Sequence, residues 1–89
     1  MSKQEQIKKA NDLALVLEAD LLRLYGPMLT GDSLRQALGY STMDALRQAI
    51  FRKTIPIPLF QLENRRGRFA LVKDVASWLA EERENAVKK

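Results

Sequence analysis

The 89-residue chain contains no cysteine and no histidine. Without cysteine it has no disulfide framework, no thiolate nucleophile and no cysteine-ligated metal, and without histidine it lacks the usual proton shuttle and the commonest metal ligand. No apolar run approaches the roughly 18–20 residues that a membrane-spanning helix needs. The opening residues, MSKQEQIKK, show neither the apolar core nor the cleavage site of a signal peptide. We therefore expect a cytoplasmic protein that uses no metal and no cofactor.

An enzymatic role is also not expected. Serine, aspartate, glutamate, lysine and tyrosine are present, but no nucleophile has a recognisable base beside it. The length indicates one small domain. Domains of this size bury a limited share of their surface, so they often depend on a partner chain or a ligand for stability.

The basic excess lies in the middle of the chain. Residues 54–73 hold four basic side chains against one acidic side chain, and residues 26–53 hold four against two, whereas residues 1–25 are balanced. A localised basic excess is typical of proteins that bind a polyanion such as nucleic acid. The alternative at this point is a solvated surface with chance clustering of charge.

Residues 4–25 are predicted to form one long helix. Apolar residues recur there at spacings of three and four, and Gly26-Pro27 end the pattern. The apolar stripe is wider than one neighbouring element covers, which indicates either ordinary intramolecular core or a face that pairs with a second copy. The residues assigned to that dimer face are Ile7, Ala14, Leu17, Leu21 and Leu24.

Two shorter helices are expected next, over residues 31–38 and 42–52. Thr30 is the expected N-cap of the first, and Gly39 ends it. Ser41-Thr42-Met43-Asp44 fits a capping box at the start of the second, with Asp in place of the usual Glu. The second helix has to end before Thr54-Ile55-Pro56-Ile57-Pro58, because two prolines enforce extended backbone.

A β-hairpin and a closing helix complete the predicted elements. Residues 59–62 and 69–72 are short β-type runs, and an arginine-rich tip joins them, with Gly67 to supply a positive φ. The closing helix is expected over residues 74–84, with a frayed tail at 85–89.

Two helices joined by the tight turn Gly39-Tyr40-Ser41 are a helix-turn-helix candidate. The basic hairpin that follows makes the plan that of a winged helix-turn-helix, in which one helix enters the major groove and the wing contacts phosphates or the minor groove. The predicted fold class is therefore mainly α with a small β-hairpin wing. Residues 27–84 form the winged domain, and the long helix in residues 1–26 precedes it.

The candidate DNA contacts follow from this plan. Hydroxyls and backbone N–H groups at the start of the 42–52 helix suit phosphate oxygens, and arginine and glutamine side chains that face away from the core bond guanine and adenine. Wing arginines supply salt-sensitive attraction, although they could instead only solvate an exposed turn. The residues assigned to DNA binding are Ser41, Thr42, Met43, Arg47, Gln48, Arg52, Lys53, Asn64, Arg65, Arg66 and Arg68.

The aromatic residues are assigned mainly to packing. Phe51 falls on the outward side of its helix, and we expect it to pack under the hairpin or against the first helix rather than to contact a base. Trp78 is expected in the core, and Tyr25 and Tyr40 are expected to be packing residues.

From Leu29 onward the chain resembles the excisionase and AlpA-like regulators of the MerR superfamily. The resemblance is carried by LTGDSLRQALGYS, DALRQAIFRKTIPIP, FQLENRRGRFALV and KDVASWLAEE. The chain departs from the family in the segment after Gly39, which is one residue longer than usual, and in its additional N-terminal helix. The resemblance implies a prokaryotic, nucleoid-associated protein that binds short double-stranded DNA sites of a phage, plasmid or integrated mobile element.

Two roles are consistent with that resemblance: transcription regulation, and excision control by a recombination directionality factor that bends DNA. A rival class is a protein-interaction module that uses the apolar N-terminal helix. Double-stranded DNA and a second copy of the chain are the expected partners, and a membrane is not.

Overall fold

The structure, a computed structural model, describes the backbone of residues 3–87 and the side chains of residues 11–87. Its elements are α1 (Lys3–Tyr25), β1 (Met28–Thr30), α2 (Gly31–Leu38), α3 (Met43–Phe51), β2 (Phe69–Leu71) and α4 (Val72–Val87). The described chain is thus mainly helical with a small antiparallel sheet. All of the predicted helices are present.

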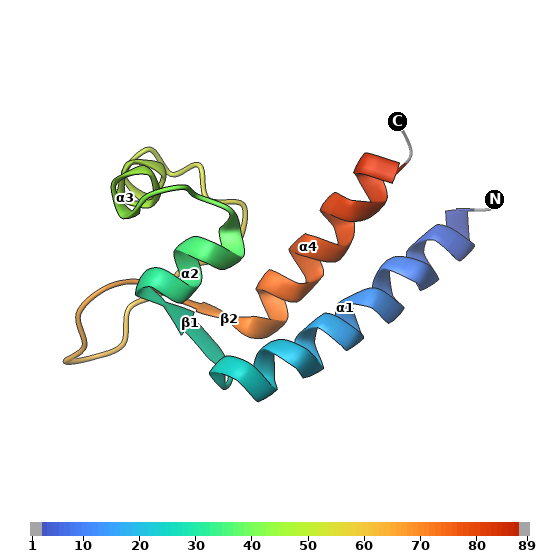
Figure 1. The fold of residues 1–89 in the computed structure, drawn as a ribbon, viewed down its shortest axis with the longest axis horizontal. Helices are drawn as coiled ribbons and strands as arrows, with labels where there is room; N and C mark the ends of the chain where they lie inside the picture. The colour runs from blue at the N-terminus through green and yellow to red at the C-terminus, as the bar shows by residue number, and fades with distance from the viewer. Residues whose placement is uncertain (1–2, 88–89) are drawn as a thin grey trace.

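The molecule has two parts that meet at the sheet (Figure 1). Helices α1 and α4 lie side by side and run in opposite directions, so the start of α1 and the end of α4 lie at the same far end of this pair. Helices α2 and α3 and the loop before β2 lie at the other end. The Cα radius of gyration is 14.1 Å, above the roughly 12 Å of a compact domain of this length, because the helix pair extends away from the rest.

The helix pair covers most of the residues that were assigned to a dimer face. Ala14, Leu17 and Leu21 are half-buried on one side of α1, and α4 is the helix that lies along it. Leu21 also packs against the central core. Leu24 is exposed, and the side chain of Ile7 lies outside the described residues. Of the two interpretations of this stripe, intramolecular packing accounts for Ala14, Leu17 and Leu21, whereas pairing with a second copy stays a prediction.

The predicted hairpin is present only as one antiparallel bridge, and the longer strand pairing of β2 is with β1. β2 pairs with β1, with Leu29 opposite Ala70 and Thr30 opposite Phe69. On its other edge β2 makes only one bridge, between Phe60 and Phe69. Residues 59–62 do not form a regular strand: only Phe60 pairs with β2, and a turn follows in which the Leu62 carbonyl accepts a hydrogen bond from the Arg65 N–H at 3.1 Å.

The core lies where the sheet, α2, α3 and the start of α4 meet. Its buried residues come from every element except α1, and half-buried apolar residues, Trp78 and Tyr40 among them, pack around it. Burial of such side chains is the main favourable term in folding. The buried cluster consists of Leu29, Leu34, Leu38, Leu46, Ile57, Ala70, Val72 and Val75.

Backbone and side-chain hydrogen bonds fix the turn that leads from α2 to α3. Gly39 adopts φ 84°, and its N–H donates to the Gln36 carbonyl at 3.1 Å while the Tyr40 N–H donates to the Arg35 carbonyl at 3.1 Å. This Schellman arrangement ends α2 as predicted. The side chain of Arg35 reaches back over the turn, where Nη1 donates to the Tyr40 carbonyl at 2.9 Å.

The N-cap of α3 lies one residue later than predicted. The Thr42 Oγ1 accepts a hydrogen bond from the Ala45 N–H at 3.0 Å. The expected capping box from Ser41 to Asp44 is therefore wrong: with Met43 as the first helical residue, the third position is alanine, which carries no acceptor.

The last helix is longer than predicted. It begins at Val72 rather than at residue 74 and continues to Val87. Residues 85–87 are therefore helical where a frayed tail was expected, and residues 88–89 lie outside the described residues. Within residues 3–87, every helix is too short or too polar to cross a membrane.

Candidate nucleic-acid interface

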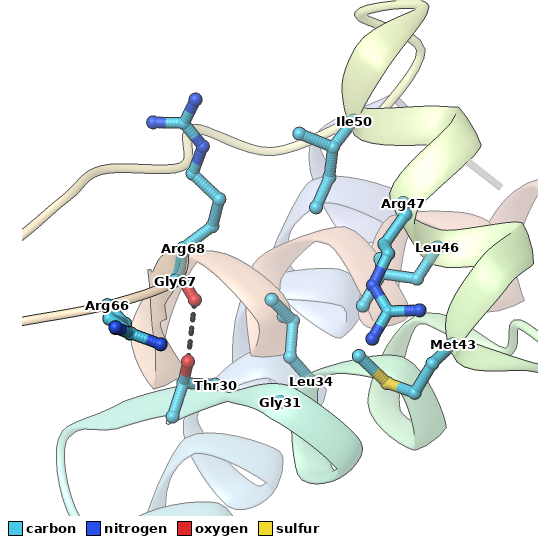
Figure 2. A pocket seen from close by; sticks show the side chains of 10 residues that line it. All are labelled: Thr30, Gly31, Leu34, Met43, Leu46, Arg47, Ile50, Arg66, Gly67 and Arg68. Carbon is cyan, nitrogen blue, oxygen red and sulfur yellow. Dashed lines mark hydrogen bonds between the residues drawn. The ribbon is translucent and has the colours of Figure 1, made fainter.

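A groove of about 450 Å³ separates α3 from the loop that precedes β2. Figure 2 shows Met43 and Arg47 entering it from α3, with Arg66 and Arg68 on the opposite wall. The buried side chain of Leu34 lies at its base. The groove therefore has an apolar floor and a basic rim that two segments distant in sequence build together.

The two faces of α3 differ sharply. Leu46 and Ala49 are buried against the core, whereas Asp44, Arg47 and Gln48 are exposed. Because a helix turns about 100° per residue, these exposed positions and Phe51 share one outward face. The outward direction predicted for Arg47 and Gln48 is confirmed.

Arg47 has an acidic neighbour on that face. Its Nη1 donates to the Asp44 Oδ1 at 2.8 Å, and both side chains are largely solvent-exposed. Exposed pairs one helical turn apart are weak. Arg47 is therefore oriented by Asp44 but can exchange this partner for a stronger anion.

The loop of residues 61–68 is attached to the body of the molecule at its base. The Thr30 Oγ1 donates to the Arg68 carbonyl at 2.7 Å, the bond drawn in Figure 2. Gly67, beside this bond, adopts φ 90°, a conformation that favours glycine. Thr30 is thus the positional N-cap of α2, as predicted, but its hydroxyl holds the loop rather than capping the helix.

Below the loop, the rings of Phe60 and Phe69 stack with their centroids 6.1 Å apart. Asn64 occupies the left-handed region at the outer turn, with φ 63°. Arg65, Arg66 and Arg68 are exposed, and none of them forms an ion pair with another described residue. No described acidic side chain therefore neutralises these three positive charges.

Most of the residues assigned to DNA binding are exposed, but they are not all in one place. Met43, Arg47, Arg66 and Arg68 line the groove. Lys53 shares a second, adjoining hollow of about 280 Å³ with Arg68. The remaining assigned residues lie outside both linings: Ser41, Thr42, Gln48, Arg52, Asn64 and Arg65. Met43 is half-buried, so its contribution is packing at the groove floor.

The end of α3 carries a second feature that the sequence did not reveal. Lys53 has φ 59°, and its N–H donates to the Ile50 carbonyl at 3.1 Å while the Thr54 N–H donates to the Ala49 carbonyl at 3.0 Å. This is the helix-ending arrangement that usually places glycine in the left-handed position. Lysine in this left-handed position is strained, and the strain lies at the edge of the candidate interface.

Three features of the site were missed or misjudged from sequence. Thr30 and Leu34 line the groove but were not assigned to the site. The strand pairing that places them there joins segments some forty residues apart, so no local sequence pattern indicates it. Phe51 is 87% exposed, so the expectation that it packs under the hairpin or against α1 is wrong. Tyr25 is also exposed, contrary to its assignment to packing.

The arrangement supplies positive charge and hydrogen-bond donors around an open groove. Within residues 11–87 no cluster of acidic side chains is placed to hold a metal ion. Comparisons with protein-family models, with curated proteins and with solved structures found no match to this chain. The resemblance to excisionase-like regulators therefore stays a prediction.

Proposed function

We propose that the chain is a sequence-specific double-stranded DNA-binding protein of the winged helix-turn-helix type. Helices α2 and α3 form the helix-turn-helix, and residues 61–68 form the wing. The observation that carries the proposal is that Arg47 of α3 and Arg66 and Arg68 of the wing border one groove. A duplex that receives α3 in its major groove then brings its adjoining phosphates to the wing.

The chemistry of the two elements differs in kind. Arg47 and Gln48 lie on the outward face of α3, where arginine can bond guanine and glutamine can bond adenine through two hydrogen bonds each. The wing arginines lie on an exposed loop, where they attract phosphates irrespective of sequence. The proposal therefore assigns specificity to α3 and salt-sensitive affinity to the wing.

The biological role that we propose is regulation of transcription in a phage, plasmid or integrated mobile element. The alternative is a recombination directionality factor, which would act by bending DNA. DNA bending measured on the preferred duplex separates the two, because a strong bend is required by the second role and not by the first.

A second class of function, a protein-interaction module, draws on the exposed apolar residues of α1. Leu15 and Val16 are 65% and 57% exposed, and Leu22 lies on the same helix at 43%. Together with Leu24, the exposed member of the predicted face, these are the apolar residues of α1 available to a second chain. Sedimentation of the purified protein tests this alternative, and a monomer at high concentration would remove the homodimer.

The decisive experiment selects preferred duplexes from a random pool and reads them by sequencing. Affinity for the selected duplex is then measured against salt concentration. If about five phosphates are neutralised, the logarithmic plot should have a slope of about −4 to −5. Absence of an enriched motif, or affinity independent of salt, would refute the proposal.

Variants separate the two elements. Replacing Arg65, Arg66 and Arg68 with alanine should weaken binding to all duplexes alike and should flatten the salt slope by up to about 3. Arg47→Ala or Gln48→Ala should instead change the selected motif. Arg83→Ala is a matched control, because this exposed arginine lies on α4, in the helix pair away from the groove.

A further inference from the structure

Phe51 is the most exposed large apolar side chain among residues 11–87. It is 87% exposed at the end of α3, and nothing in the described chain covers its ring. Single exposed apolar residues are common on protein surfaces, so exposure alone assigns no role. The position of this ring on α3 is what distinguishes it.

Phe51 lies at the middle of the outward face of α3. It follows Arg47 by four residues and Gln48 by three, so around the helix it falls between these two side chains. Leu46 and Ala49 occupy the opposite, buried face. The ring cannot reach the core without rotation of the whole helix, and a macromolecule that lies along the outward face of α3 over Arg47 and Gln48 comes within reach of Phe51.

We propose that Phe51 contacts the C5-methyl group of a thymine in the major groove and thereby adds a specificity-determining contact. The inference rests on the proposed DNA-binding function. The thymine methyl is the apolar group that the major-groove edges of the base pairs display, and phenylalanine is among the side chains that contact it.

The charge around the ring favours DNA over an apolar protein partner. Arg47, Arg52 and Lys53 are exposed near Phe51, against Asp44 alone on the acidic side. Burial of this surface against a protein would desolvate these cations, whereas a duplex pairs them with phosphates. The aromatic ring is then the one apolar contact within a basic reading face.

The test replaces each thymine of the selected duplex, one at a time, with deoxyuridine, which differs only by the absent methyl. For the wild-type protein, one position should weaken binding by about fourfold, the equivalent of roughly 0.8 kcal/mol for one buried methyl group. Phe51→Ala should bind the thymine and deoxyuridine duplexes equally. Phe51→Leu should retain part of the difference.

Val87→Ala is the matched control, because it removes another highly exposed apolar side chain from α4, a helix that no proposed contact surface includes. It should keep the full sensitivity to deoxyuridine. Circular dichroism melting of each variant verifies that it folds, which the exposure of both positions favours.

The outcomes are distinguishable. If the wild-type protein selects no duplex, both the DNA-binding function and this inference fail. If it binds with no sensitivity to deoxyuridine at any position, or if Phe51→Ala retains the sensitivity, only the methyl contact is overturned. Equal weakening of the thymine and deoxyuridine duplexes by Phe51→Ala, together with reduced DNA bending, would instead identify the ring as a wedge between base steps.

Discussion

Removal of the Arg35 side chain should loosen the turn that sets the position of α3. Nη1 of Arg35 donates to the Tyr40 carbonyl at 2.9 Å and approaches the Ser41 carbonyl at 3.4 Å. Nε donates to the Asp32 Oδ1 at 2.7 Å. The Arg35 side chain is only 19% exposed, whereas that of Asp32 is 64% exposed. One guanidinium thus joins the first turn of α2 to the segment that leads into α3.

The magnitude follows from the burial of each contact. A hydrogen bond to a charged group contributes about 1.5–3 kcal/mol, and the partly buried bond to the Tyr40 carbonyl falls in that class. The Asp32 contact is exposed, and solvent screens it. Arg35→Ala should therefore lower the free energy of unfolding by about 2 kcal/mol, which is roughly a 30-fold change in the folding equilibrium. Arg35→Lys should lower it by less, since it keeps the charge but not the fork of donors.

Urea denaturation measures this loss as a shift of the midpoint at constant slope. Arg23→Ala is the matched control: Arg23 makes the same type of pair with Asp20 at 3.2 Å, with both side chains more than half exposed, and donates to no turn carbonyl among the described residues. It should change stability by less than about 0.5 kcal/mol. Equal effects of Arg35→Ala and Arg23→Ala would refute the reasoning that the turn carbonyls make Arg35 structural.

Lys53→Gly should raise the thermal midpoint by several degrees, because glycine relieves a left-handed backbone strain of about 1 kcal/mol. The same substitution should weaken DNA binding, because it removes a cation. A lower midpoint in calorimetry would contradict the first expectation. Thr30→Val should remove the hydrogen bond to the Arg68 carbonyl and lower the free energy of unfolding by about 1 kcal/mol. NMR relaxation should then show a more mobile backbone in residues 61–68. Unchanged relaxation would mean that other contacts hold the loop. The pKa of Asp32 is lowered by its hydrogen bond from Arg35, with an added favourable charge interaction. Its folded-state pKa lies below the unfolded one, so this contact stabilises the fold above the ordinary aspartate pKa of about 3.9 and is lost as the pH falls through the folded value. The stability difference between wild type and Asp32→Asn should therefore shrink in acid, and a difference independent of pH from 7 to 2.5 would count against it.

The sequence by itself determined the helices and the two faces of α3. Each of the first three helices is a local pattern: apolar spacing of three and four residues, then Gly26-Pro27, Gly39 or the prolines after Thr54 to end it. The same periodicity separated Leu46 and Ala49 from Arg47 and Gln48 before any fold was known. These features depend on residues within one or two helical turns of each other, so local physics decides them.

Only the tertiary structure decided which segments meet. β2 pairs along its length with Met28–Thr30, some forty residues earlier, and with its neighbour in sequence only through the Phe60–Phe69 bridge. The role of the apolar face of α1 was ambiguous for the same reason: the width of an apolar stripe does not indicate which of its residues a distant helix will cover. The groove, the anchor at Thr30 and the exposure of Phe51 all depend on such long-range packing, which residue spacing does not encode.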